Sequence, residues 1–125
     1  MKSVRFALVG SGAIAPTHAR VITSLEGAEL AAVHSTSAVK GYELARQFGC
    51  AYYADYGALL AESSCDAVVI CTPSGTHAPQ AVEAARAGKH VIVEKPLAIT
   101  LEQADAVLRS CRENGVQLGC ILQRR

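Results

Sequence analysis

The sequence predicts an α/β protein, with a doubly wound, mostly parallel sheet of about six strands and helices on both faces. Three observations point to this class. Short apolar runs alternate with longer segments of helical periodicity along the whole chain. The connections between apolar runs span ten or more residues, as a crossover between parallel strands requires. The apolar run at 66–72 is nearly continuous, which is typical of a strand covered on both faces.

The first half of the chain is expected to contain three strands and three helices. The strands are predicted at 4–10, 28–34 and 51–54, and the helices at 14–25, 38–48 and 56–63. Pro16 falls in a first helical turn, where its missing N–H has no intrahelical partner to lose. Gly49 ends the second helix, because glycine accepts the left-handed conformation found there. Asp55 is a good N-cap for the third helix.

The second half continues the same alternation. The strands are predicted at 66–72, 90–94 and 116–122, and the helices at 76–88 and 100–114. The first of these helices is rich in alanine, and one of its faces suits close packing on a sheet. Thr100 and Gln103 have the spacing of a capping box, and Gly115 follows the last helix. The chain stops directly after an apolar strand, so we expect it to be part of a longer polypeptide.

Size and composition exclude several classes of protein. The 125 residues, half of them hydrophobic, suit one domain with a hydrophobic core. The formal net charge of +1 and the aromatic content of 5% offer no surface for nucleic acid or for an anionic membrane. No apolar stretch approaches the ~20 residues of a membrane helix, and the N-terminus lacks the features of a signal peptide. We therefore expect a cytoplasmic protein that binds neither nucleic acid nor membrane.

The five cysteines do not predict a metal site or disulfides. They are Cys50, Cys65, Cys71, Cys111 and Cys120. Their number is odd, no pair has Cys-x-x-Cys spacing, and no cysteine–histidine cluster has the spacing of metal ligands. We expect reduced thiols and no bound metal. Cys71 and Cys120 lie in apolar runs and are expected to be buried.

A glycine motif separates the first predicted strand from the first predicted helix. Its residues are Gly10, Ser11, Gly12, Ala13, Ile14 and Ala15, which match Gly-x-Gly-x-x-Gly/Ala. Gly10 allows a sharp turn, Gly12 leaves the backbone accessible to a pyrophosphate, and Ala15 lets helix and strand approach. The anion would lie on free N–H groups at the positive end of the helix. The motif predicts a dinucleotide site, and a purely structural turn is the alternative.

The end of the second predicted strand bears on the choice of cofactor. An acidic residue there would bind the ribose 2′-hydroxyl of NAD. This chain instead has Ser35 and Thr36, with Lys40 as the nearest basic residue and no carboxylate between Glu29 and Glu43. Hydroxyls and a lysine accept a 2′-phosphate, which a carboxylate would repel. The pattern favours NADP over NAD, although neutral residues also bind a plain ribose.

Two further motifs follow the fourth and fifth predicted strands. CTPSGTH occupies 71–77, and VEKPLA occupies 93–98, both at the carboxyl edge of the sheet, where ligands bind. Lys95 is placed to hydrogen-bond a substrate oxygen and to stabilise negative charge during hydride transfer. The alternative for Lys95 is a solvated surface lysine. His18 and His77, taken singly, suit helix-start or packing positions better than catalysis.

Together these motifs resemble the nucleotide-binding domain of the Gfo/Idh/MocA oxidoreductases, which include glucose–fructose oxidoreductase and inositol 2-dehydrogenase. The specific part is CTPSGTH followed by AGKHVIVEKPLA at 87–98, and the resemblance extends over nearly the whole chain. It implies a Rossmann domain over residues 1–125 that binds NADP or NAD. It also implies a second, α+β domain outside this chain, which supplies the substrate pocket, a proton-transferring histidine and much of a homo-oligomer interface.

The resemblance also implies a role for each motif residue. Gly10, Ser11, Gly12, Ala13 and Ile14 would hold the pyrophosphate; Ser35, Thr36 and Lys40 would surround the adenosine ribose; Thr72, Pro73, Ser74 and His77 would line the path to the nicotinamide; Glu94, Lys95 and Pro96 would lie near the nicotinamide, and Gln123 would approach its end. The Lys95–Pro96 bond is one that tolerates the cis form. The implied reaction is hydride transfer to or from a sugar, cyclitol or related polyol, with Lys95 polarising the oxygen. A non-catalytic, dinucleotide-binding sensor is the alternative, and an inherited fold that binds nothing is a third reading.

Overall fold

A computed structural model describes residues 3–121 and contains one parallel sheet. Its strands are β1 (Val4–Val9), β2 (Ala28–His34), β3 (Ala51–Tyr53), β4 (Ala67–Ile70), β5 (His90–Glu94) and β6 (Leu118–Ile121). They lie in the order β3-β2-β1-β4-β5-β6, and every neighbouring pair is parallel. The strand order reverses between β1 and β4, so the loops that follow these two strands diverge and leave a crevice at the carboxyl edge.

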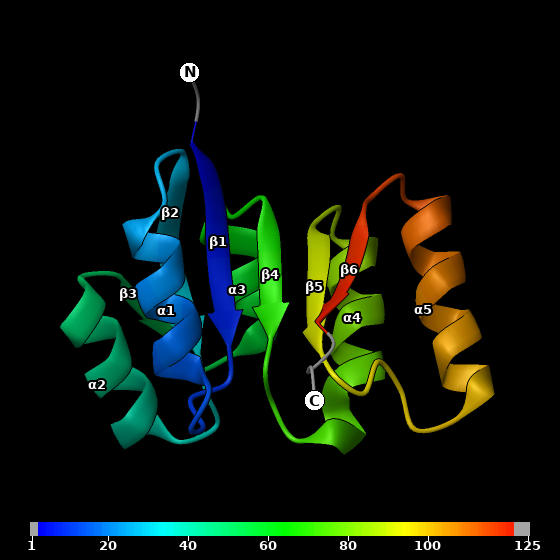
Figure 1. Cartoon of the computed structure of the whole chain (residues 1–125), viewed down its shortest axis with the longest axis horizontal. Helices are drawn as coiled ribbons and strands as arrows, with labels where there is room; N and C mark the ends of the chain where they lie inside the picture. Colours follow the sequence, from blue (N-terminus) through cyan, green and yellow to red (C-terminus); the bar gives the residue numbers. More distant parts are fainter. Residues whose placement is uncertain (1–2, 122–125) are drawn as a thin grey trace.

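Helices cover both faces of the sheet, as the sequence predicts. They are α1 (Ala15–Ser24), α2 (Ala38–Phe48), α3 (Tyr56–Glu62), α4 (His77–Arg86) and α5 (Leu101–Glu113), with a 3₁₀ turn, η1 (Ser74–Thr76), before α4. In Figure 1, α1 and α2 lie in front of the sheet, and α3 and α4 lie behind it. Among the described residues no helix is long and apolar enough to cross a membrane.

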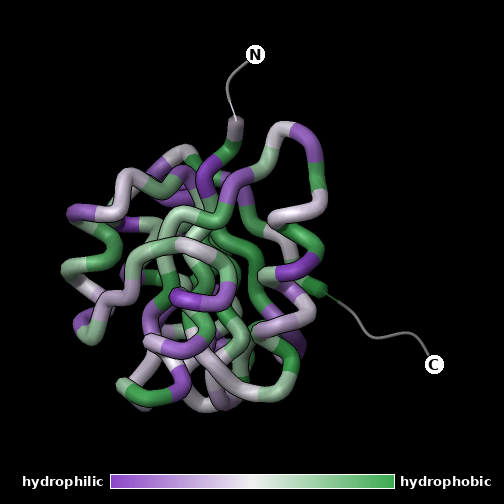
Figure 2. Tube along the Cα trace, turned by 90° about the vertical axis from the view of Figure 1, so that its left-hand side faces the viewer, coloured by the Kyte–Doolittle hydropathy of each residue, from purple (hydrophilic) through white to green (hydrophobic). Residues whose placement is uncertain are grey.

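Each face of the sheet has its own hydrophobic core. Leu8, Val33 and Val69 pack against α1 and α2, whereas Val9, Val68 and Val91 pack against α3, α4 and α5. These side chains alternate between the faces along each strand, as the pleat requires. Figure 2 shows the hydrophobic segments running through the middle of the molecule. The result is a rigid support for the loops at the strand ends.

Most helix ends follow the sequence prediction. The Asp55 carboxylate accepts from the N–H of Ala58, and Gly49 adopts a left-handed conformation with φ +70°. Thr100 accepts from the N–H of Gln103 at 3.1 Å. The capping box differs in its return contact, because Gln103 Oε1 accepts from the N–H of Ile99 and not from that of Thr100.

Several boundaries and one burial prediction need correction. The helix predicted at 76–88 begins at His77 and ends at Arg86, after the 3₁₀ turn. The last strand begins at Leu118, two residues later than predicted. Cys120 is exposed, so the prediction of burial is wrong. Among the described residues, strand β6 pairs with β5 alone and lies at the edge of the sheet, which leaves Cys120 without a neighbouring strand to cover it.

Candidate cofactor-binding site

A cleft of about 570 Å³ lies at the carboxyl edge, between the loops that follow β1, β2 and β4. Eight predicted residues line it: Gly10, Ser11, Gly12, Ser35, Thr36, Lys40, Thr72 and Pro73. Five residues that were not predicted also line it: His34, Ser37, Cys71, Thr76 and Gln80. Three of the four motif regions therefore meet in one hollow, although its first and last lining residues, Gly10 and Gln80, are 70 residues apart along the chain.

Gly10 forms the turn at the bottom of this cleft. Its φ of +114° lies in a region that side chains disfavour, and an added Cβ would come within 2.9 Å of the Cys71 carbonyl oxygen. Its N–H donates to the carbonyl of His34 at 2.8 Å. Gly10 therefore lets the end of β1 pass directly against the end of β4, and no larger residue fits there.

The position of Gly12 favours glycine for a different reason. Apart from its chain neighbours, no heavy atom of residues 3–121 lies within 4 Å of the position that a Cβ would take. Within residues 3–121 the N–H groups of Ser11, Gly12 and Ala13 find no protein acceptor, and they precede the first turn of α1. Open space beside free N–H groups at a helix N-terminus fits a diphosphate. The residues of this loop would therefore fit the diphosphate of a dinucleotide.

The adenosine end of the cleft is neutral to basic. The Ser35 hydroxyl is buried, lies 2.6 Å from that of Ser11 and accepts from the N–H of Ser37. It holds the glycine loop against β2. Thr36 and Lys40 are exposed, and among the described residues no carboxylate lines the cleft. A phosphate group on the ribose would therefore meet a hydroxyl and an ammonium group without repulsion.

The loop after β4 is held by a polar network that the sequence analysis missed. The Thr72 hydroxyl donates to Gln80 Oε1 at 2.6 Å, and the Thr76 hydroxyl lies 2.8 Å from both Thr72 Oγ1 and the Pro73 carbonyl oxygen. Gln80 thus fixes the rotamer of Thr72. The four-residue spacing of Thr76 and Gln80, which places both on one side of a helix start, was the signal available.

Lys95 lies outside the cleft lining, on an exposed turn that follows β5. Its peptide bond to Pro96 is cis. The preceding residue, Glu94, is largely buried, and its Oε2 lies 2.6 Å from His18 Nε2.

Burial, with the Glu94 carboxylate nearby, raises the pKa of the Cys71 thiol to about 12. Cys71 is therefore a protonated thiol, and it donates to the Val9 carbonyl at 3.3 Å.

His77 lies behind the cleft and not on its wall. It is 2% exposed, and its two ring nitrogens face the carbonyl oxygens of Thr72 and Pro96. Three other predicted residues, Ala13, Ile14 and Ser74, flank the cleft without lining it. Gln123 lies outside the described residues.

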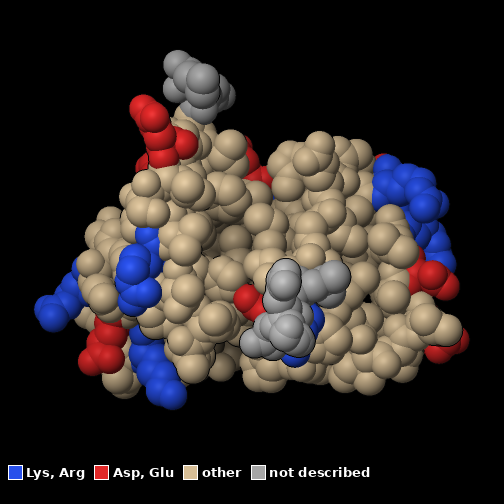
Figure 3. All heavy atoms as spheres, in the orientation of Figure 1, with Lys and Arg blue, Asp and Glu red and all other residues tan. Residues whose placement is uncertain are grey.

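A group of side chains that could bind a metal ion would be a second candidate site. Within residues 3–121, no three His, Cys, Asp or Glu side chains gather to hold a metal ion. In the face that Figure 3 shows, basic side chains gather at the left and right edges, with acidic side chains beside them. The carboxyl-edge cleft is thus the candidate site.

Residues 4–121 match a family described as an oxidoreductase family with an NAD-binding Rossmann fold, GFO_IDH_MocA. The chain belongs to the Gfo/Idh/MocA family. This confirms the resemblance drawn from the motifs, and the chain corresponds to the nucleotide-binding domain of that family.

Three members of the Gfo/Idh/MocA family illustrate the similarity. A 4-carboxy-2-hydroxymuconate-6-semialdehyde dehydrogenase from a Sphingobium species is 37% identical over 90% of this chain and 36% of its own length. A scyllo-inositol 2-dehydrogenase (NAD(+)) from Bacillus subtilis is 36% identical over 90% of this chain and 34% of its own length. The WlbA dehydrogenase from Bordetella pertussis, solved with NADH and UDP-GlcNAcA, is 35% identical with a TM-score of 0.93, over 96% of this chain and 35% of that one. The chain thus spans about a third of the length of these relatives.

Proposed function

We propose that this chain is the dinucleotide-binding domain of an NAD(P)-dependent oxidoreductase that acts on a CH–OH group of a sugar, cyclitol or related polyol. The observation that carries the proposal is the cradle beside Gly12, where free N–H groups meet open space at the start of α1. The Gfo/Idh/MocA relatives, one of which is named for scyllo-inositol, support the substrate class. A second domain would supply the substrate pocket and the proton-transferring group.

Each part of this chain would contribute to the reaction in a distinct way. The N–H groups of Ser11 to Ala13 hold the diphosphate, and the loop that carries Thr72 orients the cofactor toward the end of β5. The bound nicotinamide supplies the hydride chemistry. The Lys95 ammonium group hydrogen-bonds the reacting oxygen and stabilises the negative charge that develops on it. The protein thus provides orientation and electrostatics at a site set by the sheet edge.

NADP is the cofactor that we propose in preference to NAD. Thr36 and Lys40 are exposed beside the cleft, and no carboxylate lines it to repel a 2′-phosphate. NAD remains the alternative, because one relative is named for NAD(+) and another was solved with NADH. We also propose that the full-length protein is a homo-oligomer. We propose that it is located in the cytoplasm, where cysteines stay reduced, and the five free cysteines are consistent with this location.

A second candidate is a sensor that binds the dinucleotide without catalysis. The cleft is lined by the loops after β1, β2 and β4, whereas Lys95 lies outside this lining. A regulatory module would use that cleft and would have no need of the lysine. The two functions therefore differ in turnover and not in binding.

The test uses the full-length protein, titrated with NADPH and NADH and followed by nicotinamide fluorescence. Binding should be tighter for NADPH, and Lys40→Ala should weaken NADPH binding about 5- to 10-fold, as expected for one charge-assisted contact, while NADH binding stays unchanged. Turnover is then measured on a panel of scyllo-inositol, myo-inositol and D-glucose. Binding with turnover supports the oxidoreductase, and binding without turnover supports the sensor. Absence of binding to either dinucleotide would reject both.

A further inference from the structure

The Lys95 turn is held at both residues that flank Lys95, and both partners are histidines. His18 contacts the Glu94 carboxylate at 2.6 Å, and His77 Nδ1 lies 2.8 Å from the Pro96 carbonyl oxygen. The two histidines come from opposite faces of the sheet, since His18 belongs to α1 and His77 begins α4 (Figure 1). Neither histidine lines the cofactor cleft.

The His18 contact joins the helix of the phosphate cradle to the end of β5. The two side chains are only 17% and 22% exposed, so the contact is shielded from most of the solvent. A carboxylate only accepts, so His18 Nε2 carries the proton and donates to Glu94. Within residues 3–121, His18 is the one hydrogen-bond partner of the Glu94 side chain. Without it the Glu94 carboxylate, directly before Lys95, loses its fixed position.

The His77 contact joins the loop after β4 to the same turn. His77 is 2% exposed, and its Nε2 lies 2.6 Å from the Thr72 carbonyl oxygen while Nδ1 faces that of Pro96. Carbonyl oxygens only accept hydrogen bonds. A neutral ring donates to one of them, and a protonated ring donates to both. In either state the ring fills the space between the two segments and fixes their separation.

Lys95 itself has no such support. It is exposed, and in the part of the chain that the structure describes its ammonium group donates no hydrogen bond. A lysine side chain has four flexible methylene groups, so its direction depends on how firmly its backbone is held. The neighbouring contacts at Glu94 and Pro96 provide that hold.

We propose that His18 and His77 are positioning residues that hold the Lys95 backbone from the two faces of the sheet. The proposal rests on the proposed function, because it takes Lys95 as the group that meets the reacting oxygen. Neither histidine touches the substrate or the cofactor. Their role is to keep the ammonium group aimed at one point, which matters because misplacement by about 1 Å costs up to ~100-fold in rate.

The test compares paired substitutions in the full-length protein. His18→Gln retains a donor near the position of Nε2, whereas His18→Leu removes it. His77→Asn retains a donor near Nδ1, which faces Pro96, whereas His77→Gln retains one near Nε2, which faces Thr72. His90→Leu is the control, since His90 is exposed at the opposite end of β5, where its Nδ1 accepts from the N–H of Gln117.

Hydrogen exchange over residues 91–98, which include the ladder-bonded amides at the end of β5, is measured by mass spectrometry without any ligand and reports how firmly the turn is held. Exchange should be about 10-fold faster in His18→Leu and in His77→Gln than in the wild type, because an opening costs less once a contact is lost. It should stay near the wild-type rate in His18→Gln, His77→Asn and His90→Leu. A role in overall stability alone would not distinguish His77→Asn from His77→Gln.

Turnover and cofactor binding provide the second measurement. With the panel alcohol that the wild type oxidises fastest, kcat should fall about 10- to 100-fold in His18→Leu and in His77→Gln. The Kd for NADPH should change less than about twofold, because neither ring touches the cleft. Equal exchange and equal kcat in the two His77 variants, or wild-type values in His18→Leu, would overturn the proposal. A wild type without dinucleotide binding or turnover would instead reject the proposed function, while the exchange rates would still decide whether the two histidines hold the turn.

Discussion

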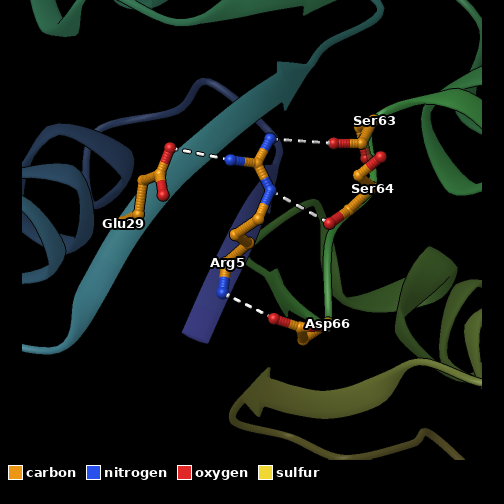
Figure 4. A network of polar contacts seen from close by, with 5 residues as sticks. All are labelled: Arg5, Glu29, Ser63, Ser64 and Asp66. Carbon is orange, nitrogen blue, oxygen red and sulfur yellow. Dashed lines mark hydrogen bonds and ion pairs between the residues drawn. The ribbon is translucent and has the colours of Figure 1, made fainter. Parts of the chain in front are cut away.

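The two ends of the parallel sheet use their polar groups in opposite ways. At the amino end, the Arg5 guanidinium lies 2.7 Å from Glu29 and donates to the carbonyl oxygens of Ser63 and Ser64, while the Arg5 N–H donates to Asp66 (Figure 4). Three segments of the chain are thereby tied together: β1, β2 and the loop at 63–66 between α3 and β4. Each of the three guanidinium nitrogens of Arg5 donates to a partner within the protein.

At the carboxyl end, strong donors are left without protein partners. Within residues 3–121 the N–H groups of Ser11 to Ala13 find no acceptor, and the Lys95 ammonium group donates to none. Polar groups are kept free here while the rest of the edge is rigidly supported. Saturated polar contacts thus mark the end that stabilises the fold, and free donors on a fixed scaffold mark the end that we propose to bind the cofactor.

The largest effect is expected at the carboxyl end, for Lys95→Met in the full-length protein. Loss of the ammonium group should lower kcat at least ~100-fold, because the charge on the reacting oxygen loses its stabilising partner. Thermal unfolding should be unchanged, since Lys95 is exposed. Steady-state kinetics with the best panel alcohol measure the effect. Near-normal turnover would remove Lys95 from the mechanism.

The second prediction separates the two glycines of the cradle. Gly12→Ala should weaken NADPH binding about 10- to 50-fold at unchanged stability, because the new methyl group enters open space where the diphosphate would lie. Gly10→Ala should also destabilise the protein, because its Cβ would come within 2.9 Å of the Cys71 carbonyl oxygen. Fluorescence titration and urea unfolding of both variants distinguish binding from folding. Equal stability losses would contradict this division.

The third prediction concerns the amino end. Arg5→Ala should lower the free energy of unfolding by about 1–2 kcal/mol, because two backbone carbonyls lose a charged donor and a partly exposed ion pair is removed. The Kd for NADPH should not change, since the cleft lies at the other end of the strands. Urea denaturation gives the first value and fluorescence titration the second. A large loss of affinity would show that the two ends are not independent.

The smallest effect is expected at alkaline pH. Burial raises the pKa of Cys50 to about 11, and burial with the Glu94 charge raises that of Cys71 to about 12, from an ordinary value of 9.0. The folded state therefore disfavours both thiolates. The stability that the two protonated thiols contribute is fully present below pH 9 and is lost as the pH rises through 11 and 12. Urea midpoints at pH 8 and 10 should differ less in Cys71→Ser than in the wild type, because serine does not ionise there. An equal difference in both proteins would exclude the Cys71 contribution.

The fold could be predicted from local patterns because each element carries its own signal. The continuous apolar run at 66–72 predicted a strand, and Asp55 and Gly49 predicted a helix start and a helix end. None of these predictions needed information about residues distant in the sequence. The glycine loop was equally local, since a strand, two glycines and a helix start lie within a few residues. The strand order was not predicted, because it depends on contacts between strands that are far apart along the chain.

The remainder depends on contacts between distant positions. His18 and Glu94 are 76 residues apart, and nothing near either residue indicates the other. Cys120 has the apolar neighbours of a buried strand, and only its place at the sheet edge explains its exposure. The capping box was predicted only in part. The spacing of Thr100 and Gln103 predicted the N-cap correctly, but it did not predict that the Gln103 side chain would accept from the N–H of Ile99.

The contact between the Ser11 and Ser35 hydroxyls, 2.6 Å apart, has a consequence for ligand affinity. It fastens the glycine loop to the end of β2 before any nucleotide arrives. The loop therefore loses its conformational entropy during folding. Nucleotide binding does not have to order the loop, so this entropy loss does not weaken the affinity. A Ser11→Gly protein would keep every donor of the cradle and still bind more weakly, because its loop would have to become ordered around each incoming ligand.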